Sequence, residues 1–131
     1  MADYSVKIVS TDKGAAFVPD FQGYQPGDPL PARVNDIVTW NNTTNDTHQP
    51  WPTDQNYNLL PDAQVPRGSD NYLSDPIPPG QSSRPSYVVT QPLPPEGPPP
   101  TWTFYYGCKL HPTATSERGT IAGSTYPKTK S

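Results

Sequence analysis

The chain has 131 residues and a net charge of −3, which fits one domain with a single modest core. Its nine lysines and arginines are scattered, and this argues against a nucleic-acid partner, which requires a clustered basic face. No run of 18 apolar residues occurs, so the sequence predicts no membrane span. A single cysteine excludes an internal disulfide, so stability must come from the core or from a metal.

Short β-rich segments are the main local pattern, because the 20 prolines and nine glycines interrupt nearly every window that could hold a helix. We predict one domain over residues 1–131, with an all-β fold of the Greek-key sandwich or barrel type. The predicted strands cover residues 4–10, 32–42, 86–91, 101–108 and 118–124, and residues 15–24 form a broken edge segment.

Two longer segments lie outside these strands. Residues 49–76 form a polar, proline-broken insertion in which DQNYNLL, residues 54–60, could make one or two helical turns. Residues 92–100, PLPPEGPPP, predict a stiff extended or polyproline II loop.

The segment TWTFYYGC, residues 101–108, carries the clearest signal. Side chains two apart share one face of a strand, so Trp102, Phe104, Tyr106 and Cys108 form one inward row. On this ground alone Cys108 could be no more than a small buried hydrophobic residue.

The soft or borderline metal ligands of the chain are one thiol and two imidazoles, from Cys108, His111 and His48. Two neutral imidazoles and one thiolate suit a copper ion that changes oxidation state, because thiolate satisfies the cuprous ion and imidazole accepts both states. Cys108 and His111 flank a tight turn at a strand end, whereas His48 follows a different strand. The sequence therefore predicts one copper ion bound where these strands end.

The order of these motifs resembles the cupredoxins, the plastocyanin-like blue copper proteins. The strand VNDIVTWNN precedes His48, the turn IPPGQS precedes the next strand, and the aromatic strand WTFYYGC leads into C-x-x-H and a final GTI strand. The resemblance covers residues 4–124 and implies a mononuclear copper protein that transfers electrons and catalyses no reaction. It also implies a location in the periplasm or elsewhere outside the cytoplasm. The first residues, MADYSVKIVS, show no signal-peptide pattern, so either the protein is cytoplasmic or Met1 and Ala2 replace a removed leader.

The sequence departs from that family at the usual axial methionine, because its only methionine is Met1. The residue two before Gly119, where the family has that methionine, is Glu117. A carboxylate there would favour the cupric state and lower the reduction potential. Four possibilities stay open for this position: Glu117, Ser116, the Thr47 carbonyl, or no ligand. Glu117 could instead be a solvated charge that pairs with Arg118 or Lys109.

The resemblance further implies that neighbours of His48 form hydrogen bonds around the site, and that the edge of His111 reaches an apolar docking patch for a redox partner. The candidates for these hydrogen bonds are Asn45, Asp46, Thr47 and Gln49, and the patch candidates are Leu110, Pro112, Pro50 and Trp51. Acidic residues of the insertion could steer a basic partner; these are Asp54, Asp62, Asp70 and Asp75. We expect transient docking by a monomer.

Two other functions remain open at this stage. The chain could be a zinc-binding or metal-free cupredoxin-like domain of a larger protein, because tetrahedral zinc accepts one cysteine, two histidines and a glutamate. It could also be an enzyme with a Cys108–His111 nucleophilic pair.

Overall fold

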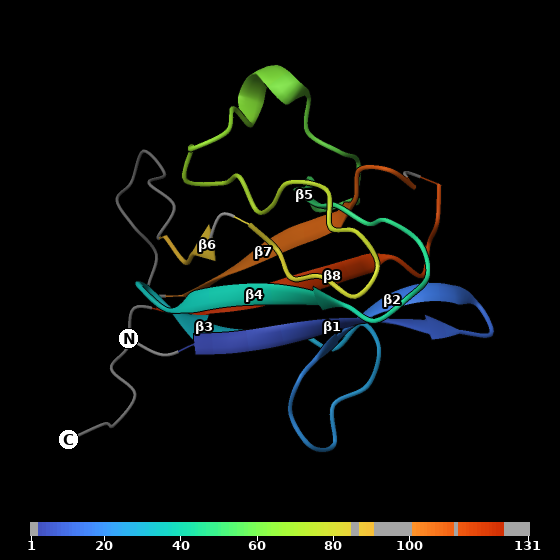
Figure 1. Cartoon of the computed structure of the whole chain (residues 1–131). Helices are drawn as coiled ribbons and strands as arrows, with labels where there is room; N and C mark the ends of the chain where they lie inside the picture. The colour runs from blue at the N-terminus through green and yellow to red at the C-terminus, as the bar shows by residue number, and fades with distance from the viewer. Residues whose placement is uncertain (1–2, 85–86, 91–100, 112, 125–131) are drawn as a thin grey trace.

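Two four-stranded β-sheets face each other across a shared core (Figure 1). The structure, a computed structural model, describes residues 3–84, 87–90, 101–111 and 113–124. One sheet has the order β2-β1-β4-β6, and the other has the order β3-β8-β7-β5. The strands are β1 (Asp3–Thr11), β2 (Gly14–Pro19), β3 (Leu30–Arg33), β4 (Ile37–Asn42), β5 (Pro50–Pro52), β6 (Tyr87–Val88), β7 (Thr101–Cys108) and β8 (Arg118–Ser124).

Each sheet is mixed, with one parallel pair and two antiparallel pairs. The parallel pairs are β1 with β4 and β3 with β8. The remaining neighbours, including β7 with β8, run antiparallel. This arrangement confirms the predicted all-β sandwich. In the described part of the chain the helical content is a 3-10 turn, η1 (Asp62–Gln64), and no helix there has the length and apolarity to cross a bilayer.

Alternation along β4 and β7 builds the part of the core that lies beneath the site. Val38 and Trp40 of β4 are fully buried, and Trp40 meets Tyr106 of β7 edge to face, with ring centroids 5.3 Å apart. The inward row predicted for residues 102–108 is confirmed. Tyr106 and Cys108 are buried, and Trp102 and Phe104 are partly buried against the core. Both strands therefore end in a buried polar or sulfur-containing residue, Asn42 and Cys108.

Several strand predictions hold and one is wrong. The segments predicted at 4–10, 101–108 and 118–124 correspond to β1, β7 and β8, and β2 is an edge strand. The segment 32–42 is not one strand, because a turn divides it into β3 and β4 in opposite sheets. Asn35 adopts a left-handed φ of 77°, and the Asp36 carboxylate accepts a hydrogen bond from the Arg33 amide at 2.8 Å.

The segment 49–76 begins with a strand that the sequence did not predict. β5 pairs with β7, so that Pro50 lies opposite Cys108. The expected helical turns at residues 54–60 are absent, because the Asp54 carboxylate accepts hydrogen bonds from the Asn56 and Asn58 amides and forms a turn. The predicted loop 92–100 lies outside the described residues.

Candidate metal centre

The connection from β7 to β8 brings Cys108, His111 and Glu117 to one place. Gly107 pairs with Arg118, so Cys108 and Glu117 start and finish the connecting loop opposite each other. Within the loop, the His111 amide donates to the Cys108 carbonyl at 3.2 Å, and the Glu117 amide donates to the Ala114 carbonyl at 3.1 Å. These hydrogen bonds close two turns within the loop.

His48 reaches the same place from the other sheet. It follows β4 by six residues and forms an isolated antiparallel bridge with Ile77. The His48 amide donates to the Ile77 carbonyl at 3.2 Å, and the Ile77 amide donates to the His48 carbonyl at 2.7 Å. These two hydrogen bonds fix the backbone of His48 independently of its side-chain contacts.

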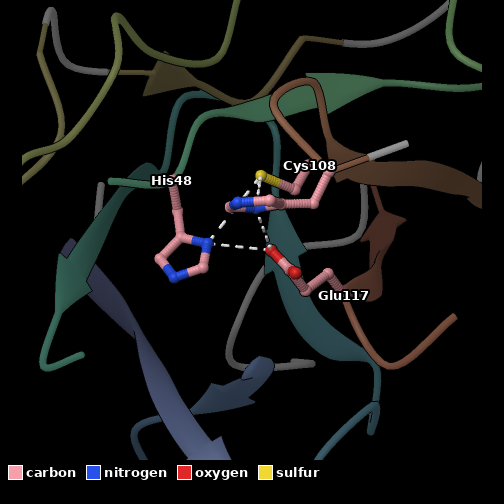
Figure 2. A group of neighbouring side chains, drawn as sticks. His48, Cys108 and Glu117 are labelled. Atoms are coloured by element: carbon pink, nitrogen blue, oxygen red, sulfur yellow. Dashed lines mark hydrogen bonds and ion pairs between the residues drawn. The ribbon is translucent and has the colours of Figure 1, made fainter. Parts of the chain in front are cut away.

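The four side chains converge on a common point. Figure 2 shows His48, Cys108 and Glu117 pointing towards one another. Cys108 Sγ lies 3.8 Å from His48 Nδ1 and 3.4 Å from His111 Nδ1. Glu117 Oε1 lies 2.8 Å from His48 Nδ1 and 3.2 Å from His111 Nδ1. One ligand atom from each residue falls within 4.8 Å of all the others.

Three of the four candidate ligands are buried. The exposed fractions are 1% for His48, 2% for Cys108 and 6% for Glu117, whereas the His111 side chain is 37% exposed. The pKa of the Cys108 thiol is raised to about 11, mainly by burial; a hydrogen bond from the Gln49 amide lowers it in part, and the nearby Glu117 carboxyl contributes to the rise. Without a cation the thiol is therefore protonated at neutral pH.

The donor set fits a soft or borderline metal ion. Donor atoms bonded to one ion at about 2.0–2.3 Å lie roughly 3.3–3.7 Å apart, close to the separations from Cys108 Sγ to the two imidazoles. A buried carboxylate is unfavourable unless it is hydrogen-bonded or paired with a positive charge. A cation at this point would serve that purpose, and one sulfur with two imidazole nitrogens is a set suited to copper.

Glu117 is not the solvated loop charge that the sequence left open. It is buried, and neither of its suggested partners pairs with it. Lys109 forms an ion pair with Asp62 at 2.9 Å and lies over the Trp51 ring, and the Arg118 guanidinium lies 4.9 Å from the centre of the Tyr57 ring. Ser116, the neighbouring candidate, directs its Oγ towards Gly14, where a Cβ would come within 3.0 Å of it.

The hydrogen bonds around the site come largely from residues that the sequence analysis did not select. Thr44 Oγ1 lies 2.9 Å from His48 Nε2, and Asn42 bonds to Thr44. Of the predicted neighbours, Gln49 contributes through its backbone amide, which donates to Cys108 Sγ at 3.4 Å. Asp46 contributes through its backbone carbonyl, which accepts from Asn42 Nδ2 at 2.6 Å, whereas the side chains of Asn45 and Asp46 are exposed. The i, i+4 spacing of Thr44 and His48 within one polar turn was the available signal.

The predicted apolar patch is partly wrong. Leu110 is 43% exposed beside His111, as expected. Pro50 and Trp51 are buried, because Trp51 packs beneath the insertion, where its Nε1 donates to the Leu60 carbonyl at 2.8 Å and its ring meets Tyr72 edge to face. Pro112 lies outside the described residues.

The acidic residues of the insertion are largely engaged within the chain. Asp62 pairs with Lys109, and Asp75 forms two hydrogen bonds with the Arg67 guanidinium at 2.9 Å and another with the Tyr72 hydroxyl. Asp54 caps its own turn. These contacts help to fold the insertion over Trp51.

Alkylation of Cys108 by iodoacetamide should report the raised pKa directly. Because the thiolate is the reactive form, the labelling rate of the metal-free protein should keep rising with pH beyond 9, towards about 11. The expected rate at neutral pH is roughly 100-fold below that of an ordinary thiol, since each pKa unit is a factor of ten in thiolate. The measurement is the pH–rate profile of labelling, with free cysteine as control. A plateau below pH 9 would contradict this environment.

The fold is that of the cupredoxins. A solved purple cupredoxin from Nitrosopumilus maritimus matches with a TM-score of 0.58 and 20% identity, over 92% of this chain and 98% of that one. A mutant of amicyanin in the Cu(I) state matches at 0.49 and 18% identity, over 92% of this chain and 80% of the other. A blue copper oxidase from Nitrosomonas europaea matches at 0.48 and 20% identity, over 99% of this chain and 40% of the other. No protein-family model matches the sequence, and no curated protein matches it either.

Proposed function

We propose that this chain is a mononuclear copper protein that transfers electrons, with the ion held by His48, Cys108, His111 and Glu117. The observation that carries the proposal is that one ligand atom from each of these residues lies within 4.8 Å of the others, in a cupredoxin fold. Copper bound there would supply a one-electron couple between its cupric and cuprous states. Three of these four residues are buried away from water, and the imidazole of His111 remains partly accessible.

The exposure pattern supports electron transfer rather than catalysis. His111 connects the cluster to the surface and lies next to the exposed Leu110, which gives a short path to a transiently docked partner. A nucleophilic enzyme would need a reactive thiolate, and the raised pKa of Cys108 opposes that role. We further propose that the protein acts as a monomer outside the cytoplasm, where metal would protect its thiol.

Zinc is the second candidate ion. The buried carboxylate of Glu117 completes a cysteine, two-histidine and glutamate set that a tetrahedral zinc site accepts. In that case the chain would be a structural or binding domain without redox activity.

Titration of the metal-free protein with Cu(II) separates the two. We expect one equivalent to bind and to produce an intense visible thiolate-to-copper charge-transfer band, together with an electron paramagnetic resonance signal from one mononuclear site. Competition with Zn(II) gives the preference between the ions. Binding of Cu(II) without such a band would reject the electron-transfer function and favour the zinc alternative.

A further inference from the structure

A buried polar cluster lies directly behind the site, in the turn that follows β4. Asn42, Thr44 and His48 are all buried and joined by hydrogen bonds. Buried polar groups of this kind are stable only if each donor finds an acceptor, so the positions of the protons can be deduced group by group.

The orientation of the Asn42 amide is fixed by its four partners. Its Nδ2 donates to the Asp46 carbonyl at 2.6 Å and to the Ile77 carbonyl at 2.9 Å. Its Oδ1 accepts from the Thr44 amide at 2.9 Å and lies 2.7 Å from Thr44 Oγ1. The reversed orientation would set the Asn42 NH2 group against the Thr44 amide N–H and bring an oxygen against two carbonyls.

The hydroxyl of Thr44 then has one direction for its proton. Its oxygen neighbours are Asn42 Oδ1 at 2.7 Å and the Asp46 carbonyl at 3.1 Å, and both of these can only accept. The hydroxyl proton therefore goes to one of them, and Thr44 Oγ1 remains an acceptor towards His48 Nε2, 2.9 Å away. It follows that Nε2 of His48 carries a proton.

We propose that Asn42 and Thr44 are positioning residues that hold the proton of His48 on Nε2 and so leave the Nδ1 lone pair for the metal. Nδ1 is the nitrogen that faces the cluster, 2.8 Å from Glu117 Oε1 and 3.8 Å from Cys108 Sγ. In the metal-free protein Nδ1 and Glu117 share a hydrogen bond at that distance, and the ion would displace its proton. The assignment of the proton rests on the hydrogen bonds alone, and its purpose rests on the proposed function.

Asn42 also links the ring of His48 to its backbone. The Ile77 carbonyl accepts from Asn42 Nδ2 and from the His48 amide, while the Asn42 carbonyl accepts from the Gly80 amide at 2.9 Å. Asn42 thereby holds the turn 43–47 against the segment around Ile77. Through Thr44 it also determines which nitrogen of His48 carries the proton. Metal-binding histidines are commonly oriented by a hydrogen bond to their second nitrogen, whose loss costs about 10–100-fold in metal affinity.

Nitrogen–proton correlation NMR of histidine side chains in the metal-free protein tests the proton position. We expect His48 to carry its proton on Nε2 in the wild type. In Thr44→Val the Nε2–H has no acceptor, so the proton should move to Nδ1, where it can donate to Glu117. Because the hydrogen bond that orients the ring through Nε2 is then lost, the Zn(II) dissociation constant should rise about 10–100-fold.

Two matched variants separate positioning from a general loss of stability. Thr44→Ser keeps the hydroxyl and should retain the wild-type tautomer and Zn(II) affinity. Thr43→Val removes a neighbouring hydroxyl that bonds to the Ile8 carbonyl at 2.7 Å instead, and should change neither property.

A wild-type spectrum with the proton on Nδ1 and none on Nε2 would overturn the proposal, and so would a folded Thr44→Val protein with wild-type tautomer and affinity. If Thr44→Val does not fold, the wild-type spectrum still decides. A proton on Nε2 in a protein that binds no copper would sustain the positioning role and reject the proposed function.

Discussion

Replacement of Cys108 by serine should abolish the copper-dependent visible band and lower copper affinity by more than about 100-fold. Loss of a residue that only hydrogen-bonds to a ligand costs up to about 100-fold in metal affinity, and loss of a ligand should cost more. Cys108 holds the sole sulfur that the structure brings to the cluster, and the chain has no second cysteine to replace it. Serine keeps the size of the side chain but removes the soft thiolate, which is the ligand that the cuprous ion prefers.

The control for this variant is Ser116→Ala. Ser116 lies in the same loop, but its Oγ faces Gly14 rather than the cluster, so its removal should leave the spectrum and affinity unchanged. Absorption titrations with Cu(II) compare the three proteins. A Cys108→Ser protein that retains the charge-transfer band would show that the band does not come from this thiolate.

Replacement of Glu117 by glutamine should raise the reduction potential by at least about 60 mV, which corresponds to a tenfold change in the relative binding of the two copper states. The carboxylate contributes a negative charge at the cluster and stabilises the more highly charged cupric ion preferentially, whereas the amide has the same shape without the charge. The visible spectrum should change as well.

Asp62→Asn serves as the matched control for charge. Asp62 is an exposed carboxylate paired with Lys109, the residue after Cys108, so its replacement removes one negative charge outside the cluster. Solvent and salt screen such a charge, and the potential should move much less. Redox titration followed by absorption measures both shifts. An unchanged spectrum and potential in Glu117→Gln would remove Glu117 from the coordination sphere.

The fold could be predicted from the sequence where it depends on the alternation of side chains along a single strand. Alternation in residues 101–108 predicted β7 and its inward row, because side chains of a strand must point to opposite faces. The division of residues 32–42 was missed, since it depends on a left-handed Asn35 and on an Asp36 carboxylate that bonds to the chain three residues earlier. β5 was missed because its sequence, PWP, has no strand pattern and pairs only through its long-range partner β7.

The candidate ligands were predictable from a short inventory, since the chain offers one cysteine and two histidines, and the family resemblance added Glu117. The packing and the hydrogen bonds around these ligands could not be predicted in the same way. Burial of Trp51 depends on how the insertion folds over it, and the role of Thr44 depends on the rotamer of His48. Both arise from tertiary packing, and the local signal for Thr44 was no more than its i, i+4 spacing from His48.

Copper K-edge X-ray absorption of the copper-loaded protein tests the central claim most directly, because it reports the atoms bound to the ion. We expect one sulfur, two imidazole nitrogens and a carboxylate oxygen, with the sulfur lost in Cys108→Ser and the oxygen contribution altered in Glu117→Gln. A copper ion with no sulfur neighbour in the wild-type protein would contradict the account.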